Sequence, residues 1–188
     1  MEAIEIEADS GTHSAVIIGS GFGGQCAAMT LRKAGIDDFV ILERRAFVGG
    51  TWCQNSYPGA AVDVQSPLYS ISSEPYAWTQ MFADQAELQA YTNHVLDKHA
   101  LRPHIRVNAE VTEARWTEDA WTVYTADGRE FRGKYLINAS GPLSTPVIPD
   151  FAGRELFTGK SFHTNDWDHS FDSRGKRVAV IGSGASAA

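Results

Sequence analysis

The chain has 188 residues, with 16 basic and 23 acidic side chains and a formal net charge of −7. This is the length of roughly one domain, and hydrophobic residues make up 43% of it, as is typical of a globular protein. An acidic balance without a lysine or arginine run argues against nucleic acid as a partner. No apolar run reaches the ~18 residues of a membrane span, so no membrane contact is expected.

The amino terminus and the cysteines indicate a compartment. Residues 1–10 are acidic and lack the basic-then-apolar pattern of a secretory signal. Cys26 and Cys53 are too few for a disulfide scaffold and are compatible with a reducing environment. We therefore expect a cytoplasmic protein.

A strand, a helix and a second strand open the chain. Residues 14–18 are a short apolar run rich in β-branched side chains, which predicts a buried parallel strand. Residues 25–34 have helix-forming composition with apolar side chains on one face, and Gly35 ends them. Residues 39–42 predict the second strand, which completes a βαβ unit of about 30 residues.

The turn between the first strand and the helix has the glycine pattern of a dinucleotide site. Gly19 permits a tight turn, Gly21 lets the backbone approach a pyrophosphate, and Gly24 allows close packing of helix on strand. The helix amino terminus offers free N–H groups to an anion. Glu43 ends the second strand about 20 residues later, where a carboxylate accepts hydrogen bonds from a ribose. The alternative is a plain tight turn with an exposed glutamate, but the order of the elements favours a cofactor site.

The middle of the chain combines a long loop with shorter elements. Residues 44–80 lack a regular pattern but are rich in aromatic side chains, and loops of this length are usually functional. Residues 85–100 predict an amphipathic helix. Asp127-Gly128 predicts a hairpin turn within a β-meander. Strands are predicted at residues 105–107, 110–116, 121–125, 130–132 and 134–138.

The glycine pattern returns near the end of the chain. After loop-like residues 142–175, residues 176–181 predict a last strand. Gly182 and Gly184 repeat the first two glycines, and Ala187 takes the third position, which the pattern allows. Two dinucleotide sites in one chain indicate hydride transfer from a nicotinamide to a flavin.

Three motifs together resemble class B flavoprotein monooxygenases. They are Gly-Gly-Thr-Trp at residues 49–52, Tyr-Pro-Gly-Ala-Ala-Val-Asp at 57–63 and Phe-x-Gly-x-x-x-His-Thr-x-x-Trp-Asp at 157–168. The last is similar to the fingerprint of Baeyer–Villiger monooxygenases. Residues 139–144 resemble the segment that crosses between domains in this family, usually with threonine where Ser140 stands. The family often has arginine where this chain has Ala61. The resemblance covers residues 14–187.

The resemblance implies an α/β fold with two Rossmann-type domains. A tail (residues 1–13) would precede the amino-terminal part of an FAD-binding domain (residues 14–145), a parallel sheet with an inserted antiparallel β-meander. A linker with the fingerprint (residues 146–175) would lead into the start of an NADP-binding domain (residues 176–188). The chain is therefore expected to be the amino-terminal part of a longer enzyme.

The resemblance also implies roles for individual residues. The implied FAD contacts are Gly19, Gly21, Phe22, Gly24, Glu43, Thr51, Trp52, Asp63, Tyr69 and Val111. Asp63 would also be catalytic, by pairing with an active-site arginine outside this chain. The implied NADPH contacts are Gly182, Ser183, Gly184, Ala185, Ser186 and Ala187. His163 and Trp167 of the fingerprint would couple the cofactor domains and influence the orientation of NADPH. His163 has no partner at metal-ligand spacing, so no metal site is expected.

The implied reaction consumes a ketone, O2 and NADPH and gives an ester or lactone. The choice of NADPH over NADH rests on the family resemblance. Two alternatives remain open: a flavin-containing monooxygenase that oxidises N or S atoms, and a catalytically inactive FAD-binding fragment. The 188 residues alone are expected to retain flavin weakly and to show little turnover.

Overall fold

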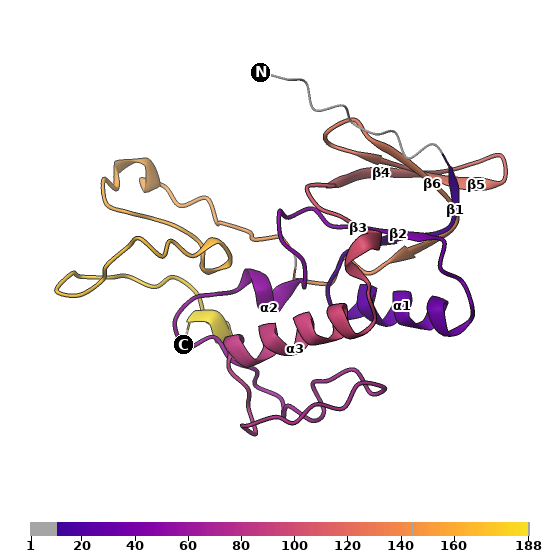
Figure 1. Cartoon of the computed structure of the whole chain (residues 1–188). Helices are drawn as coiled ribbons and strands as arrows, with labels where there is room; N and C mark the ends of the chain where they lie inside the picture. The colour runs from indigo at the N-terminus through magenta and orange to yellow at the C-terminus, as the bar shows by residue number, and fades with distance from the viewer. Residues whose placement is uncertain (1–10, 144, 188) are drawn as a thin grey trace, which may run out of the picture.

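The computed structural model describes residues 11–143 and 145–187 (Figure 1). Residues 1–10 of the expected tail, Ser144 of the expected crossover and Ala188 lie outside the described residues. The chain has the expected α/β fold, in which a mixed sheet is covered by helices on one face.

One sheet and three helices make up the regular structure of the described residues. The strands are β1 (Thr12–Ile18), β2 (Phe39–Leu42), β3 (Ile105–Arg106), β4 (Val111–Thr117), β5 (Ala120–Thr125) and β6 (Glu130–Asn138). Their order in the sheet is β3-β2-β1-β6-β5-β4. The helices are α1 (Phe22–Lys33), α2 (Thr51–Gln54) and α3 (Gln85–Lys98). Single 3-10 turns lie at Arg102–His104, Arg154–Leu156, Thr164–Asp166 and Ala185–Ala187.

The expected βαβ unit forms the centre of the sheet. β1 lies between β2 and β6 and pairs in parallel with both. All four residues of β2 are buried, as a strand covered on both faces requires. α1 begins at Phe22, three residues before the predicted start, because Gly23 and Gly24 already belong to the helix.

Each face of the central strands has its own apolar core. The face toward α1 and α3 buries Ala15, Ile17, Ala28, Phe39, Ile41, Leu96 and Leu101. The opposite face buries Val16, Val40, Leu42, Ala109, Val123 and Phe131. The second set joins β1 and β2 to β5 and β6, so the β-meander curls over the face that the helices leave free.

The two segments predicted at residues 130–132 and 134–138 are one strand, which corrects the sequence interpretation. Residues 130–133 of β6 pair antiparallel with β5, and residues 132–138 pair in parallel with β1. Gly133, which lies between the two predicted segments, packs against β1: a Cβ atom there would lie 2.8 Å from Cγ2 of Val16. Glycine therefore allows close approach of two backbones inside a continuous strand.

The strand predicted at residues 176–181 is not formed. Val178, Val180 and Ile181 are 56%, 65% and 73% exposed. A β-strand exists through hydrogen bonds to a neighbour, and no strand of the described sheet lies next to this segment. The segment has the apolar composition of a strand, but an apolar run becomes a strand only where a sheet accepts it.

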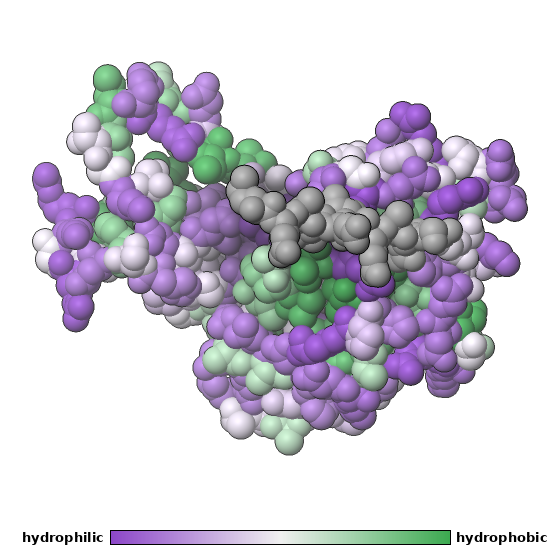
Figure 2. Space-filling model, turned by 45° about the horizontal axis from the view of Figure 1, so that its top comes forward, coloured by the Kyte–Doolittle hydropathy of each residue, from purple (hydrophilic) through white to green (hydrophobic). Residues whose placement is uncertain are grey.

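Residues 145–187 run out to one side of the domain and return beside α2 (Figure 1). The early part of this segment displays apolar side chains on its surface (Figure 2). Among the exposed ones are Val147, Leu156 and Phe157. Within the described part of the chain, no helix has the length and apolar character needed to cross a bilayer.

Candidate functional site

The turn between β1 and α1 is built from backbone in close contact. Gly19 has φ +100°, and a Cβ atom there would lie 2.5 Å from the carbonyl oxygen of Ala139. A Cβ atom at Gly24 would lie 1.9 Å from the carbonyl oxygen of Gly19. Gly50, with φ +72°, packs against the turn. A Cβ atom added at Gly50 would lie 2.7 Å from Cα of Gly21. Side chains are therefore excluded here, and backbone lines the turn.

The amino terminus of α1 opens at this turn. Gly21 is the N-cap residue, no described side chain caps the helix, and its first turn carries no acidic residue. The first N–H groups of a helix have no partner within it, and the helix dipole is positive at this end. The turn can therefore receive an anion such as a pyrophosphate.

Glu43 lies beside the turn and is 6% exposed. Its Oε2 accepts hydrogen bonds from the backbone N–H and the hydroxyl of Ser20, at 3.1 and 2.6 Å. Its Oε1 accepts a hydrogen bond from the backbone N–H of Arg45 at 3.0 Å. The carboxylate is fixed at the carboxyl end of the parallel strands, where ligands bind in open α/β sheets.

Three of the implied FAD contacts meet in one aromatic cluster. The indole N–H of Trp52 donates to the phenol oxygen of Tyr69 at 3.1 Å, and their rings are edge to face at 5.9 Å. The ring of Phe22 lies 5.8 Å from that of Tyr69. Trp52 is held by α2, whose first residue, Thr51, is exposed.

Asp63 and Val111 are placed apart from this cluster. Asp63 is exposed in the loop that follows the isolated bridge between Ala61 and Asp84. Val111 begins β4 and packs into the apolar core on the face opposite to the helices.

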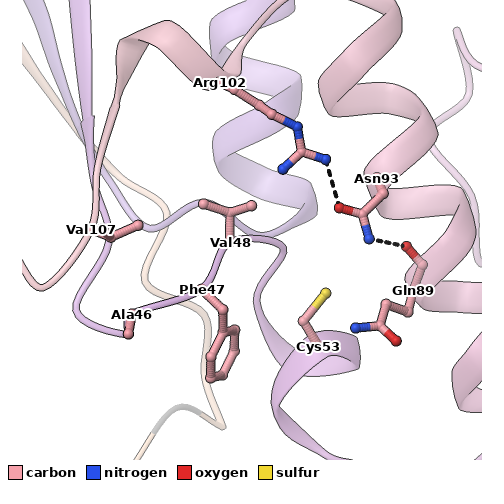
Figure 3. A pocket seen from close by; sticks show the side chains of 8 residues that line it. All are labelled: Ala46, Phe47, Val48, Cys53, Gln89, Asn93, Arg102 and Val107. Atoms are coloured by element: carbon pink, nitrogen blue, oxygen red, sulfur yellow. Dashed lines mark hydrogen bonds between the residues drawn. The ribbon is translucent and has the colours of Figure 1, made fainter.

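Two hollows flank α2. The first, about 390 Å³, is lined by Ala46, Phe47, Val48, Cys53, Gln89, Asn93, Arg102 and Val107 (Figure 3). The second, about 330 Å³, is lined by Arg45, Phe47, Cys53, Gln54, Ser56, Asn165, Asp166 and Trp167. Phe47 and Cys53 belong to both, so they form the wall between the two hollows.

Cys53 is a protonated thiol in this wall. Burial raises its pKa to about 11, although a hydrogen bond with Gln89 opposes the shift. A thiol with this pKa is almost entirely protonated near neutral pH and is a poor nucleophile. Burial also raises the pKa of the Cys26 thiol, and both cysteines are free.

The fingerprint segment is attached to the domain through a residue that sequence reasoning missed. Asn165 is 7% exposed, and its Oδ1 accepts hydrogen bonds from Nη2 of Arg45, at 3.2 Å, and from Nε2 of Gln54. Arg45 also pairs with Oδ1 of Asp166 at 3.2 Å. Asn165 occupies a variable position of the fingerprint, so no signal in the sequence marked it.

The two named fingerprint residues lie on either side of Asn165. Nδ1 of His163 accepts a hydrogen bond from the backbone N–H of Asn165 at 3.0 Å. This nitrogen is therefore unprotonated, and the ring proton is on Nε2 in the neutral form. Trp167 is half-buried, and its ring is edge to face with Phe162 at 5.1 Å.

The second glycine motif forms an open turn. Residues 182–186 are exposed and Ala187 is half-buried. Residues 185–187 make a 3-10 turn. The hydroxyl of Ser186 is hydrogen-bonded to that of Tyr57 at 2.9 Å, which brings the motif beside the loop after α2. The described residues contain no cluster of three side chains suited to a metal ion.

Comparisons with known proteins give the chain a context. Residues 16–188 match the family described as pyridine nucleotide-disulphide oxidoreductase. The chain is 49% identical over 174 residues to a Baeyer-Villiger monooxygenase of Streptomyces coelicolor, which covers 91% of this chain and 33% of that protein. It is 42% identical over 186 residues to the FAD-binding monooxygenase ktnD of Aspergillus niger, covering 92% of this chain and 31% of that protein.

Solved structures show the same relationship. The structure of oxidized steroid monooxygenase bound to NADP is similar with a TM-score of 0.85 and 39% identity, over 93% of this chain and 35% of that one. The chain thus spans about a third of the length of the proteins it matches.

Proposed function

Because this chain belongs to the pyridine nucleotide-disulphide oxidoreductase family, we propose that it supplies the FAD site of an FAD- and NADPH-dependent monooxygenase. The proposed reaction inserts one oxygen atom of O2 next to a ketone carbonyl and gives an ester or lactone. The similarity to a Baeyer-Villiger monooxygenase along 91% of this chain supports the proposal.

The observation that carries the FAD assignment is the environment of the Glu43 carboxylate. A carboxylate offers about four acceptor positions, and three hydrogen bonds from Ser20 and Arg45 are made to this one. A position remains for a ribose hydroxyl. The side chain lies beside the glycine turn, whose backbone and helix terminus suit the pyrophosphate of the same dinucleotide. The residues present therefore fit the adenosine and pyrophosphate parts of FAD.

The flavin end of FAD is assigned to the loop that carries α2. The bound flavin would supply the redox and oxygen chemistry of the reaction. Phe22, Trp52 and Tyr69 form an aromatic wall that would exclude water from the flavin. Thr51 would line the ring, and the exposed carboxylate of Asp63 is free to pair with an arginine from outside this chain. Val111 would contact the adenine side.

NADPH is assigned to the end of the chain, and this part rests on the glycine repeat and on the NADP-bound relative. Gly182, Ser183, Gly184, Ala185, Ser186 and Ala187 would hold its pyrophosphate. His163 and Trp167 would influence how it is oriented. The proposed division of the chain is an FAD-binding part at 14–145, a linker at 146–175 and the start of an NADP-binding domain at 176–188.

The substrate class and compartment belong to the same proposal. A ketone and O2 are the proposed small-molecule partners, and the cytoplasm is the proposed location. Two free cysteines support a reducing compartment. Oxidation at N or S atoms is the competing activity.

Two measurements test the proposal. The first is titration of the chain with FAD, followed by flavin fluorescence, in which saturable binding is expected and its absence would contradict the FAD assignment. The second uses the protein that contains this chain together with its complete NADPH site. It is offered a cyclic ketone, an amine and a thioether separately under ¹⁸O2. An ester or lactone carrying one ¹⁸O atom is expected, whereas oxidation of the amine or thioether alone would support the competing activity.

A further inference from the structure

The fingerprint segment touches the domain through one buried side chain. Asn165 is the only buried residue of the described segment 145–187. The flanking Thr164 and Asp166 are half-buried and exposed. The segment also meets the loop after α2 through exposed hydrogen bonds, between Ser56 and His169 at 2.7 Å and between Tyr57 and Ser186 at 2.9 Å, so Asn165 provides the buried part of the contact.

Asn165 binds one residue that follows β2 and one residue of α2. Its Oδ1 accepts from Nη2 of Arg45, which follows β2, and from Nε2 of Gln54, which ends α2. A hydrogen bond from a charged donor is stronger than one between neutral groups. The ion pair of Arg45 with Asp166 adds a second contact to the same guanidinium.

Arg45 connects this contact to the carboxylate of Glu43, the proposed acceptor for the ribose. Its backbone N–H donates to Oε1 of Glu43 at 3.0 Å, while its side chain reaches Asn165. Its Nε is buried and makes no hydrogen bond within the described residues, and Nη2 makes the contacts to both Asn165 and Asp166. Arg45 therefore contacts both the carboxylate of Glu43 and Asn165 of the fingerprint.

We propose that Arg45, Gln54 and Asn165 form a latch, and that this latch positions the fingerprint segment in response to FAD. Asn165 is a positioning residue: it acts through Arg45 and Gln54 and holds Trp167, two residues further along, over the second hollow. When a ribose hydroxyl occupies the open position on Glu43, the Arg45 backbone is fixed and the latch tightens. The response to FAD rests on the proposed function, whereas the latch itself does not.

Hydrogen–deuterium exchange of the peptide covering residues 162–168 tests the latch in the 188-residue chain without cofactor. Asn165→Ala removes the acceptor that Arg45 and Gln54 share, and Arg45 keeps only its ion pair with Asp166. We expect exchange in this peptide to become about tenfold faster, the effect of losing one charge-assisted hydrogen bond. Asn165→Asp keeps an oxygen acceptor and should restore slow exchange. Asn93→Ala is the matched control, because it breaks an Asn–Arg hydrogen bond (2.8 Å, to Arg102) elsewhere in the fold.

Addition of FAD tests the response. In the wild-type chain, FAD should slow exchange at residues 162–168, and in Asn165→Ala this slowing should disappear while FAD still binds. Equal exchange of wild type and Asn165→Ala without FAD would overturn the latch. Slowing by FAD that survives in Asn165→Ala would overturn its role in the response. Failure of FAD to bind the wild-type chain would contradict the proposed function and the response, while the exchange measured without FAD would still decide whether the latch exists.

Discussion

Ser20 donates two hydrogen bonds to the same oxygen atom of Glu43, one from its backbone N–H at 3.1 Å and one from its hydroxyl at 2.6 Å. The same hydroxyl accepts a hydrogen bond from the backbone N–H of Gly49 at 3.1 Å. Ser20 thus joins the glycine turn, the end of β2 and the start of the loop that carries α2. The proposed FAD site requires these three segments to keep fixed positions relative to one another.

Glu43→Gln should weaken FAD binding by about ten- to a hundredfold. The amide NH2 group replaces one carboxylate oxygen and faces the donors of either Ser20 or Arg45, and the amide accepts fewer hydrogen bonds than a carboxylate does. The measurement is a fluorescence titration with FAD. Glu113→Gln, which changes an exposed carboxylate on β4, is the control and should bind FAD as the wild type does. Equal affinity of Glu43→Gln and wild type would remove Glu43 from the site.

Two neighbouring glycines of α1 should respond to alanine with opposite signs. Gly24→Ala should lower the free energy of unfolding by roughly 1–3 kcal/mol or more, because the new Cβ atom would lie 1.9 Å from a backbone oxygen. At Gly23 the new Cβ atom would make ordinary contact with Cβ of Ala139 at 3.4 Å. Gly23→Ala should therefore raise the free energy of unfolding by roughly 0.5–1 kcal/mol, as expected inside a helix. Urea denaturation measures both, and equal effects would contradict the packing described for the turn.

Glu74 should make the stability of the chain fall at acidic pH. Its buried carboxylate pairs with Nζ of Lys98 at 2.6 Å and with Nε2 of His99 at 2.8 Å, and the hydrogen bond from Lys98 is the main reason that its pKa lies below the usual 4.5. The unfolded chain therefore binds more protons in this range, so stability is complete above about pH 4.5 and is lost as the pH falls toward the folded-state pKa.

Glu74→Gln should remove this part of the pH dependence. Urea denaturation between pH 3 and pH 6 should give a smaller loss of stability in the variant than in the wild type. Asp172→Asn, which breaks a local pair with Arg174 on the surface, should leave the curve nearly unchanged. Parallel curves for wild type and Glu74→Gln would show that the pairing does not contribute.

Cys53 should react slowly with alkylating reagents. A pKa of about 11, against the usual 9.0, lowers the thiolate fraction near pH 8 by about a hundredfold. Iodoacetamide labelling at pH 8, followed by mass spectrometry of the peptide, should show this slowing relative to a short peptide that contains a free cysteine. Labelling in urea should remove the difference. Rapid labelling of the folded chain would mean that the thiol is exposed or activated.

Local patterns are sufficient to predict much of the fold and the relationship to monooxygenases. The βαβ unit is predictable because β-branched runs, glycines and helix-forming residues each favour the same local structure. The start of α3 is also predictable, and Asp84 caps it by accepting a hydrogen bond from the Glu87 N–H at 2.9 Å. The motif resemblance to Baeyer–Villiger monooxygenases is confirmed by the identity of 49%.

The remainder depends on contacts between distant parts of the chain. The strand is predicted as two segments on either side of Gly133 because a pattern cannot show that Val16 lies against this glycine. Residues 176–181 suggest a strand because a pattern cannot show whether a sheet accepts them. Asn165 gives no signal because its partners, Arg45 and Gln54, are more than a hundred residues away in sequence.

The double pairing of β6 limits how parts of this domain can be exchanged between related proteins. Its first residues belong to the antiparallel hairpin and its last residues to the parallel sheet, and the two pairings overlap at residues 132 and 133. The meander therefore cannot be exchanged as an independent module between related proteins, since any new register in the hairpin would shift the side chains that β6 presents to β1. Recombination that respects this fold must keep β1 and β6 together, although more than a hundred residues separate them in the chain.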